Sequence, residues 1–340
     1  MKIGILGAGQ LARMMILESK NIGFDFVLFC PEVTSTTRNL AEHVVASFTD
    51  KEALQKFCQQ VDVITFESEN IPEETIDFIR EHNKVYPPKK SLLTAQDRLQ
   101  EKNLCHELDI PTNQFKPVAS YFDVLLAAKE FGLPLILKSR RFGYDGKLQH
   151  HIRTKDELTA LKNEDFTDFM AESYVPFSRE ISLISVRNLS GEVSFYDLCQ
   201  NKHEQGILRE TTNICDESLF LMAQQSSRKI MDFCDYVGVL ALEFFVHDGR
   251  LIFNEMAPRV HNSGHWTIEG AYTSQFENHI RSIAGLPLGN VKSTGNWKMI
   301  NCIGEMPNKR DIMSLGGFYH DYQKSPREKR KLGHTTFLSS

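Results

Sequence analysis

The first hundred residues alternate short apolar runs with amphipathic segments, and this alternation constrains the fold more than any other feature. The runs at 2–6, 24–29 and 61–66 have the length and apolar character of buried strands. Apolar residues at helical spacing occupy 10–20, and 72–81 also has helical character. Strands that alternate with helices predict an α/β fold with a doubly wound parallel sheet.

Beyond this region the pattern indicates further units. The charged, amphipathic stretch 91–108 predicts one helix that leads out of the first unit. Short strands are expected at 133–139, 148–152 and 169–174, and longer ones at 180–187, 193–198, 239–246 and 250–256. From about residue 288 the chain is irregular and basic. We therefore expect four units, at 1–100, 101–174, 175–287 and 288–340.

Composition places the chain among ordinary globular proteins, with 41% hydrophobic and 24% charged residues. The formal net charge of −5 gives no overall reason to expect a nucleic acid or a membrane surface as partner. No stretch approaches the ~18 apolar residues of a spanning helix, and the first apolar run is too short for a signal peptide. The seven cysteines form no C-x-x-C pair, which favours reduced thiols in the cytoplasm over disulfides or a zinc site.

A glycine-rich turn, Gly7-Ala8-Gly9-Gln10-Leu11-Ala12, follows the first expected strand. Such a turn points backbone N–H groups and a helix N-terminus toward an anion. Glu32 lies where the ribose-binding acid of a nicotinamide site would sit. The turn alone leaves three interpretations open: a dinucleotide site, a tight strand–helix connection, and a site for a phosphorylated substrate.

Lys138 ends an apolar strand and precedes a loop that contains Gly143 and Gly146. A lysine followed by a glycine-containing cationic loop suits phosphate neutralisation under a closing lid. The loop does not have the Walker A pattern. An exposed basic hairpin is the alternative interpretation.

Two acids, Glu243 and Glu255, lie among apolar neighbours on two expected strands joined by His247-Asp248-Gly249. We expect a hairpin with a three-residue loop, which brings both acids to one face. A buried carboxylate is costly unless it is paired, and magnesium takes one or two carboxylates together with substrate phosphates. The hairpin therefore predicts a Mg²⁺ site, with structural salt bridges as the alternative.

The segment 258–267 follows the second acid and is dense in hydrogen-bond donors, which favours a substrate pocket. The basic residues near 324–331 are far from these motifs and would usually form a solvated tail. Tyr322 and Gly333-His334 around them favour packing instead, with Arg330 gripping a phosphate.

Taken together, the motifs resemble those of the ATP-grasp superfamily, and within it the N5-carboxyaminoimidazole ribonucleotide synthetase family. The matching stretches span nearly the whole chain, and those at 261–267, 320–324 and 330–334 are the most specific. They separate the family from formate-using transformylases and biotin carboxylases. Phe142 and Leu148 depart from it, since the family usually has glycine at both positions.

The resemblance implies an ATP-grasp fold with an N-terminal pre-ATP-grasp domain and a small C-terminal β-rich domain. It implies a ligase of purine biosynthesis that carboxylates the amine of 5-aminoimidazole ribonucleotide with ATP, Mg²⁺ and bicarbonate, through carboxyphosphate. A cytoplasmic homodimer is implied as well.

The resemblance also implies roles for individual residues. Those expected to bind ATP are Arg98, Lys138, Gly143, Tyr144, Asp145, Gly146, Lys147, Leu148, Gln149, Glu172, Ser173, Tyr174, Val175, Glu180, His203, Asn254 and Glu255. Magnesium is expected at Glu243 and Glu255. Those expected around the acceptor are Gln10, Leu11, Tyr144, Asp145, Arg259, His261, Asn262, Ser263, Lys324 and Arg330. Chemistry is expected at Asp145, Lys147, Arg259 and Lys324.

Three rival functions remain on the sequence alone. The first is a related ATP-grasp ligase with another acceptor. The second is a nicotinamide oxidoreductase, which the glycine-rich turn alone supports. The third is an ATP-binding regulatory module without chemistry.

Overall fold

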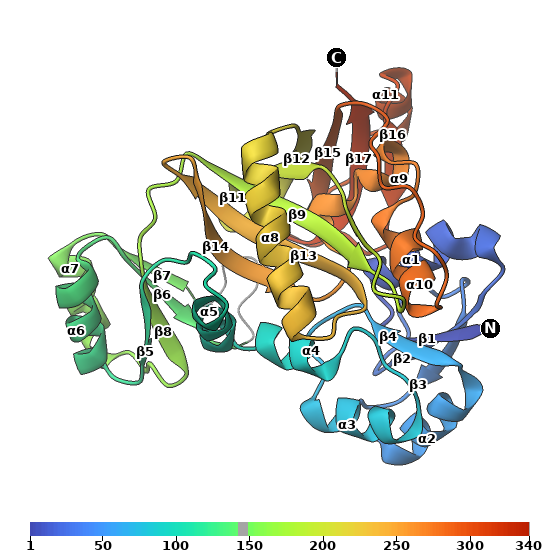
Figure 1. Ribbon diagram of the computed structural model, residues 1–340, viewed down its shortest axis with the longest axis horizontal. Coiled ribbons are helices and arrows are strands. Elements are labelled where there is room, and N and C mark those ends of the chain that lie inside the picture. Colours follow the sequence, from blue (N-terminus) through green and yellow to red (C-terminus); the bar gives the residue numbers. More distant parts are fainter. Residues whose placement is uncertain (142–148, 340) are drawn as a thin grey trace.

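The computed structural model describes residues 1–141 and 149–339, and the strands in that part of the chain form three sheets (Figure 1). The N-terminal sheet is parallel, with the strand order β3-β2-β1-β4. Its strands are β1 (Lys2–Leu6), β2 (Asp25–Cys30), β3 (Glu42–Val45) and β4 (Val63–Phe66). The predicted parallel sheet is confirmed, although β3 was not anticipated.

Helices cover both faces of this sheet. Ile3 and Ile5 of β1 share a core with α1 (Gln10–Ser19), whereas Leu6 shares another with α2 (Lys51–Gln60) and α3 (Glu73–His82). Because side chains alternate along a strand, one apolar run supplies both cores. The sheet is therefore doubly wound, as predicted.

The connection out of this unit contains two helices rather than the single helix predicted over 91–108. They are α4 (Lys89–Ala95) and α5 (Arg98–Glu107). Asp97 interrupts them with extended backbone angles, and its side chain accepts a hydrogen bond from the Leu99 amide at 3.0 Å. Asp97 therefore caps a new helix, and Arg98 becomes its first residue.

The second sheet is a small antiparallel unit that projects to one side of the molecule (Figure 1, green). Its order is β5-β8-β6-β7, from β5 (Phe115–Val118), β6 (Leu135–Ser139), β7 (Gln149–Ile152) and β8 (Phe169–Ser173). Helices α6 (Tyr121–Phe131) and α7 (Lys155–Ala160) contribute apolar residues to its core. The strand predicted to end near Lys138 is confirmed as β6.

The third sheet has nine strands and forms the centre of the molecule (Figure 1). Its main order is β14-β13-β9-β11-β12-β15-β17-β16, and β10 pairs with β9. The strands are β9 (Arg179–Arg187), β10 (Val193–Phe195), β11 (Leu198–Glu204), β12 (Ile207–Ile214), β13 (Gly238–His247), β14 (Arg250–Ala257), β15 (Trp297–Ile303), β16 (Phe318–Asp321) and β17 (Lys331–Leu338). Helices α8 (Glu217–Phe233) and α10 (Gln275–Ile283) pack against it.

Two predictions for this region are wrong. The run predicted as one strand over 193–198 ends at Phe195, and β11 starts only at Leu198. The tail from about residue 288 is not irregular, because β15, β17 and β16 extend the central sheet. The sequence did not indicate β17 because three of its buried residues, His334, Thr335 and Thr336, are polar, whereas buried residues are usually apolar.

All seven cysteines are free thiols, and six of them are buried. Among the helices within 1–141 and 149–339, none combines the length and apolar character needed to cross a bilayer.

Candidate functional site

A cleft of about 730 Å³ lies between the N-terminal unit, strands β11 to β14 of the central sheet and the C-terminal segment. Its walls come from the carboxyl ends of β1 and β4, the start of α5, strands β11 to β14 and the C-terminal segment around 322–331. Predicted site residues that line it are Gln10, Leu11, Arg98, His203, Glu243, Glu255, Arg259, His261, Asn262, Lys324 and Arg330. The cleft thus joins candidates from both ends of the sequence.

Other predicted residues lie outside this lining. Gly143, Tyr144, Asp145, Gly146, Lys147 and Leu148 fall outside the described residues. The remaining ones are Lys138, Gln149, Glu172, Ser173, Tyr174, Val175, Glu180, Asn254 and Ser263. Most of them lie on the small sheet or directly after it, and several contact the cleft residues described below.

The hairpin with the two acids has a different turn from the predicted one. His247 pairs with Arg250, so the loop has two residues, Asp248 and Gly249, both with positive φ. A regular ladder from such a loop would set Asn254 opposite Glu243. A bulge shifts the register next to Glu243, and Glu243 pairs with Glu255 after all. The three-residue loop is therefore wrong, whereas the predicted pairing of the acids is confirmed.

The two acids have opposite electrostatic environments. Burial and the charge of Glu255 raise the pKa of Glu243. Burial acts on Glu255 too, but Arg98 donates to its Oε2 at 2.7 Å and holds the pKa of Glu255 below its ordinary value. Two carboxylates that face each other across paired strands favour a cation between or beside them.

Lys138 and Glu172 form an ion pair of 2.8 Å on neighbouring strands of the small sheet. Glu172 also lies 3.5 Å from Lys102 of α5, and all three side chains are nearly inaccessible. Burial opposes its charge, but the two lysines keep the pKa of Glu172 well below its ordinary value. Lys138 reaches Asn254 at 3.4 Å, so this cluster connects the small sheet to β14.

The start of α1 is occupied by a carboxylate of the same chain. Glu67, just after β4, accepts hydrogen bonds from the backbone N–H of Gly9 and, at 3.0 Å, from that of Ala12. A Cβ added at Gly7 would lie 2.5 Å from Glu67. A side chain larger than glycine at position 7 would therefore collide with Glu67. The backbone N–H groups of Gly9 and Ala12 are already hydrogen-bonded to the Glu67 carboxylate. The N–H groups of Gly9 and Ala12 are therefore not available to a phosphate or a dinucleotide, whereas phosphate binding by the rest of the helix start, at Gln10 and Leu11, stays a prediction.

Cations from the C-terminal segment lie beside this turn. Lys324 donates to Gln10 Oε1, and burial followed by the charge of Arg330 lowers the pKa of Lys324 to about 8. Arg330 donates to the Ser325 carbonyl at 3.2 Å. Arg259, which also lines the cleft, pairs with Glu69 at 2.5 Å. The cleft therefore contains several cationic side chains, among them Lys324 and Arg330 of the C-terminal segment, which suits a phosphorylated ligand.

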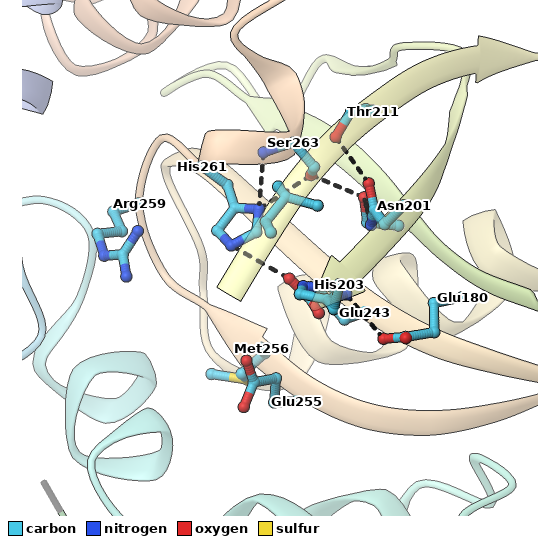
Figure 2. A network of polar contacts seen from close by, with 12 residues as sticks. Glu180, Asn201, His203, Thr211, Glu243, Glu255, Met256, Arg259, His261 and Ser263 are labelled. Atoms are coloured by element: carbon cyan, nitrogen blue, oxygen red, sulfur yellow. Dashed lines mark hydrogen bonds and ion pairs between the residues drawn. The ribbon is translucent and has the colours of Figure 1, made fainter. Parts of the chain in front are cut away.

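His203 and Glu180 form a further pair, with His203 Nδ1 2.9 Å from Glu180 Oε2 (Figure 2). Burial opposes a charge on His203, but Glu180 and then Glu243 raise its pKa to about 9. The two residues come from adjacent strands β9 and β11.

His261 lies between Ser263 and the carboxylate of Glu243 (Figure 2). Its Nε2 is 3.2 Å from Glu243 Oε1, and its Nδ1 is 2.9 Å from Ser263 Oγ. Burial and then Arg259 lower the pKa of His261 to about 3. Ser263, predicted in the acceptor site, is fully buried, and its Oγ contacts His261, which lines the cleft.

Sequence reasoning missed several residues of the cleft and its support, among them Glu67, Glu69, Glu101, Lys102 and Tyr322. Glu67 and Glu69 had a usable signal, because they follow β4 at the edge where the carboxyl ends of parallel strands gather. Lys102 lies within a charged helix and offered no such signal.

The sequence matches three domain families in chain order. Residues 1–96 match the ribonucleotide synthetase preATP-grasp domain, residues 103–276 the ATP-grasp domain, and residues 298–340 the phosphoribosylaminoimidazole carboxylase C-terminal domain. The three matches cover, in turn, the N-terminal sheet, the small sheet with strands β9 to β14 of the central sheet, and the C-terminal strands β15 to β17.

Whole-chain relatives agree with these matches. The chain is 42% identical to N5-carboxyaminoimidazole ribonucleotide synthase of Pseudomonas aeruginosa, over 99% of this chain and 94% of the relative. The crystal structure of N5-carboxyaminoimidazole ribonucleotide synthetase from Thermus thermophilus superposes with a TM-score of 0.94 at 44% identity, over 99% of this chain and 93% of the other. An Aspergillus clavatus synthase in complex with ADP and 5-aminoimidazole ribonucleotide superposes with a TM-score of 0.91 at 26% identity, with the same coverage.

Proposed function

The chain belongs to the N5-carboxyaminoimidazole ribonucleotide synthase family, and we propose that its central cleft uses ATP and bicarbonate to carboxylate the amine of 5-aminoimidazole ribonucleotide. It is an ATP-grasp ligase of purine biosynthesis. The observation that carries the proposal is the polarity of the cleft. Glu243 and Glu255 pair on β13 and β14 with Arg98 of α5 bound to Glu255, and the same cleft is lined by Lys324 and Arg330 of the C-terminal segment.

The acid side suits the nucleotide and a metal ion. We assign ATP phosphates to Arg98 and Lys138, adenine to residues 172–175, and further nucleotide contacts to Glu180, His203 and Asn254. Glu172 reaches this role through its backbone, because its carboxylate is already held by two lysines.

Magnesium fits the residues that are present. The described residues contain no group of three or more His, Cys, Asp or Glu placed to hold a metal. Two facing acids are nevertheless sufficient, because magnesium takes its other ligands from water and substrate phosphates. Glu243 and Glu255 would hold it, and the ion would neutralise the triphosphate and polarise the γ-phosphoryl group.

The cationic side suits the acceptor. We assign its 5′-phosphate to Lys324 and Arg330, with Gln10 and Leu11 beside them. Arg259 and Asn262 also line the cleft, and both polar atoms of the Asn262 side chain are buried with no hydrogen-bond partner among the residues that the structure describes. An unpaired buried amide costs free energy, so a polar ligand there is favourable.

The chemistry needs bicarbonate to be activated, because it is a poor electrophile. Phosphoryl transfer from ATP to bicarbonate gives ADP and carboxyphosphate, a mixed anhydride. The substrate amine then forms a bond to its carboxyl carbon and loses a proton, while the bond from that carbon to the phosphate oxygen breaks and phosphate leaves. Lys138 and Arg98 offset the developing charge, and the closed cleft limits hydrolysis. From the family resemblance we assign the orientation of the amine to Asp145, and substrate contacts to Tyr144 and Lys147.

Phosphate release from ATP tests the function. We expect release only when bicarbonate and 5-aminoimidazole ribonucleotide are both present. Formate, biotin and NADH serve as controls for the rival functions. Turnover that needs formate or biotin instead would contradict the proposed acceptor chemistry, and no turnover with any of them would favour the regulatory module.

We also propose the units 1–100, 101–174, 175–287 and 288–340, and a cytoplasmic homodimer. These proposals are supported by the family resemblance, and sedimentation of the purified chain tests the dimer.

A further inference from the structure

A row of buried polar side chains lies behind the acid wall of the cleft (Figure 2). Thr211, Asn201 and Ser182 belong to the neighbouring strands β12, β11 and β9, and Ser263 follows β14. Ser182, Ser263 and Thr211 have no accessible surface, and Asn201 is 7% exposed. Buried polar groups in an interior position need partners, and these four find them in one another.

The hydrogen bonds of this row all run in the same direction. Thr211 Oγ1 donates to Asn201 Oδ1 at 3.0 Å, and Asn201 Nδ2 donates to Ser182 Oγ at 3.0 Å. Ser182 Oγ donates to Ser263 Oγ at 2.7 Å. Because Ser263 Oγ accepts this bond, its own proton is available for the next group, which is His261 Nδ1 at 2.9 Å.

The tautomer of His261 follows from its neighbours. The backbone N–H of Ser263 also points at Nδ1, at 3.3 Å, and an N–H can only donate. Nδ1 is therefore an acceptor and carries no proton, so the ring proton is on Nε2. That nitrogen lies 3.2 Å from Glu243 Oε1.

Both ring nitrogens of His261 are thus directed at protein groups. We propose that His261 is a positioning residue that presents its Nε2–H to the Glu243 carboxylate, and that the row Thr211–Asn201–Ser182–Ser263 fixes the tautomer that allows it. This inference rests on the proposed cation role of Glu243. It replaces the expectation that His261 contacts the acceptor, since the ring keeps no nitrogen for it.

The Nε2 proton of His261 can hold the Glu243 carboxylate in one orientation. Glu243 must keep one orientation while it faces Glu255, whose charge repels it. An N–H aimed at Oε1 fixes one oxygen and leaves the other for the cation. Groups that orient metal-binding side chains in this way change metal affinity by about 10- to 100-fold when they are removed.

The first test is the tautomer itself, which does not depend on metal. Long-range ¹H–¹⁵N correlation spectra of the full chain distinguish Nε2–H from Nδ1–H, and His261→Gln identifies the His261 signals by their loss. We expect Nε2–H in the protein without metal or nucleotide. An Nδ1–H tautomer, or an imidazolium at neutral pH, would overturn the inference.

The second test measures Mn²⁺ affinity in the presence of a non-hydrolysable ATP analogue, by electron paramagnetic resonance. A glutamine amide reaches the position of Nε2, whereas an asparagine amide reaches only that of Nδ1. We expect His261→Asn to raise the Mn²⁺ Kd by about tenfold and His261→Gln by less than about threefold. Ser182→Ala should raise it by about threefold.

Ser185→Ala is the matched control, because Ser185 is equally buried on β9 but bonds to Ser227 instead. Its Mn²⁺ affinity should equal that of the unmodified chain. Wild-type affinity in His261→Asn, with weakened affinity in Glu243→Gln, would overturn the inference and leave the cation site standing. Unchanged affinity in Glu243→Gln would instead remove the cation site and this inference together.

Discussion

Lys102 gives the sharpest prediction about what holds the cleft together. Its Nζ donates three hydrogen bonds of 2.9 Å, to Thr112 Oγ1, Asn113 Oδ1 and the Phe253 carbonyl. It also lies 3.5 Å from Glu172, and its side chain is 1% exposed. One lysine therefore connects α5, the start of the small sheet and β14.

The cost of replacing it with methionine follows from these contacts. A hydrogen bond from a charged donor contributes about 1.5–3 kcal/mol net, but three bonds from one side chain are not additive. Removing one partner of a buried ion pair costs about 3–5 kcal/mol. Methionine keeps most of the buried volume, so packing adds little. We expect Lys102→Met to lower the unfolding free energy by about 3–5 kcal/mol.

Urea unfolding, followed by the fluorescence of Trp266 and Trp297, measures this change. Both tryptophans are buried against the central sheet to which Lys102 is anchored. Lys56→Met is the control, since Lys56 is exposed and pairs with Glu52 on its own helix. Equal unfolding midpoints for the two variants would refute the reasoning.

Three further predictions concern the acceptor side. Arg330→Ala and Lys324→Ala should each raise the KM for 5-aminoimidazole ribonucleotide about ten- to a hundredfold without changing the KM for ATP. An unchanged KM for the ribonucleotide in both variants would exclude the C-terminal segment from the acceptor site. Because Lys324 loses its charge as the pH rises through about 8, the acceptor KM should rise above that pH, and the rise should disappear in Lys324→Arg; a flat profile in the unmodified enzyme would contradict this. In Glu67→Gln one carboxylate oxygen becomes an NH₂ group, which cannot accept from the Gly9 or Ala12 N–H. We expect the unfolding free energy to fall by about 1–3 kcal/mol and amide hydrogen exchange at the start of α1 to become faster. Unchanged exchange there would show that Glu67 does not stabilise the helix start.

Local patterns were sufficient for the parallel sheet and the acid hairpin. The alternation of Ile3 and Ile5 with Leu6 appears directly in the two cores of the first sheet. The family resemblance, carried by motifs spread over nearly the whole chain, is confirmed by the relatives and the domain matches. The candidates within the cleft come from 10–11, 98, 203–262 and 324–330, which only the fold brings together.

What the sequence could not give depended on contacts between distant residues. With a two-residue turn alone, Glu243 would pair with Asn254, but the bulge beside Glu243 shifts the register so that it pairs with Glu255. No residue type at the bulge indicates it from the sequence. Glu67 accepts from the Ala12 N–H although it lies 55 residues further along the chain, and no local pattern indicates this contact. The direction of the hydrogen bonds behind His261 likewise depends on four separate segments.

The central claim is that carbon from bicarbonate is transferred to the amine of 5-aminoimidazole ribonucleotide at the expense of ATP. The most direct measurement follows ¹³C-bicarbonate by NMR in a reaction with the enzyme, ATP, Mg²⁺ and the ribonucleotide. We predict a new ¹³C carbamate signal that grows in step with released phosphate and is absent when ATP or the ribonucleotide is omitted. Phosphate release without labelled carbamate, or a labelled product that forms equally without ATP, would contradict the account.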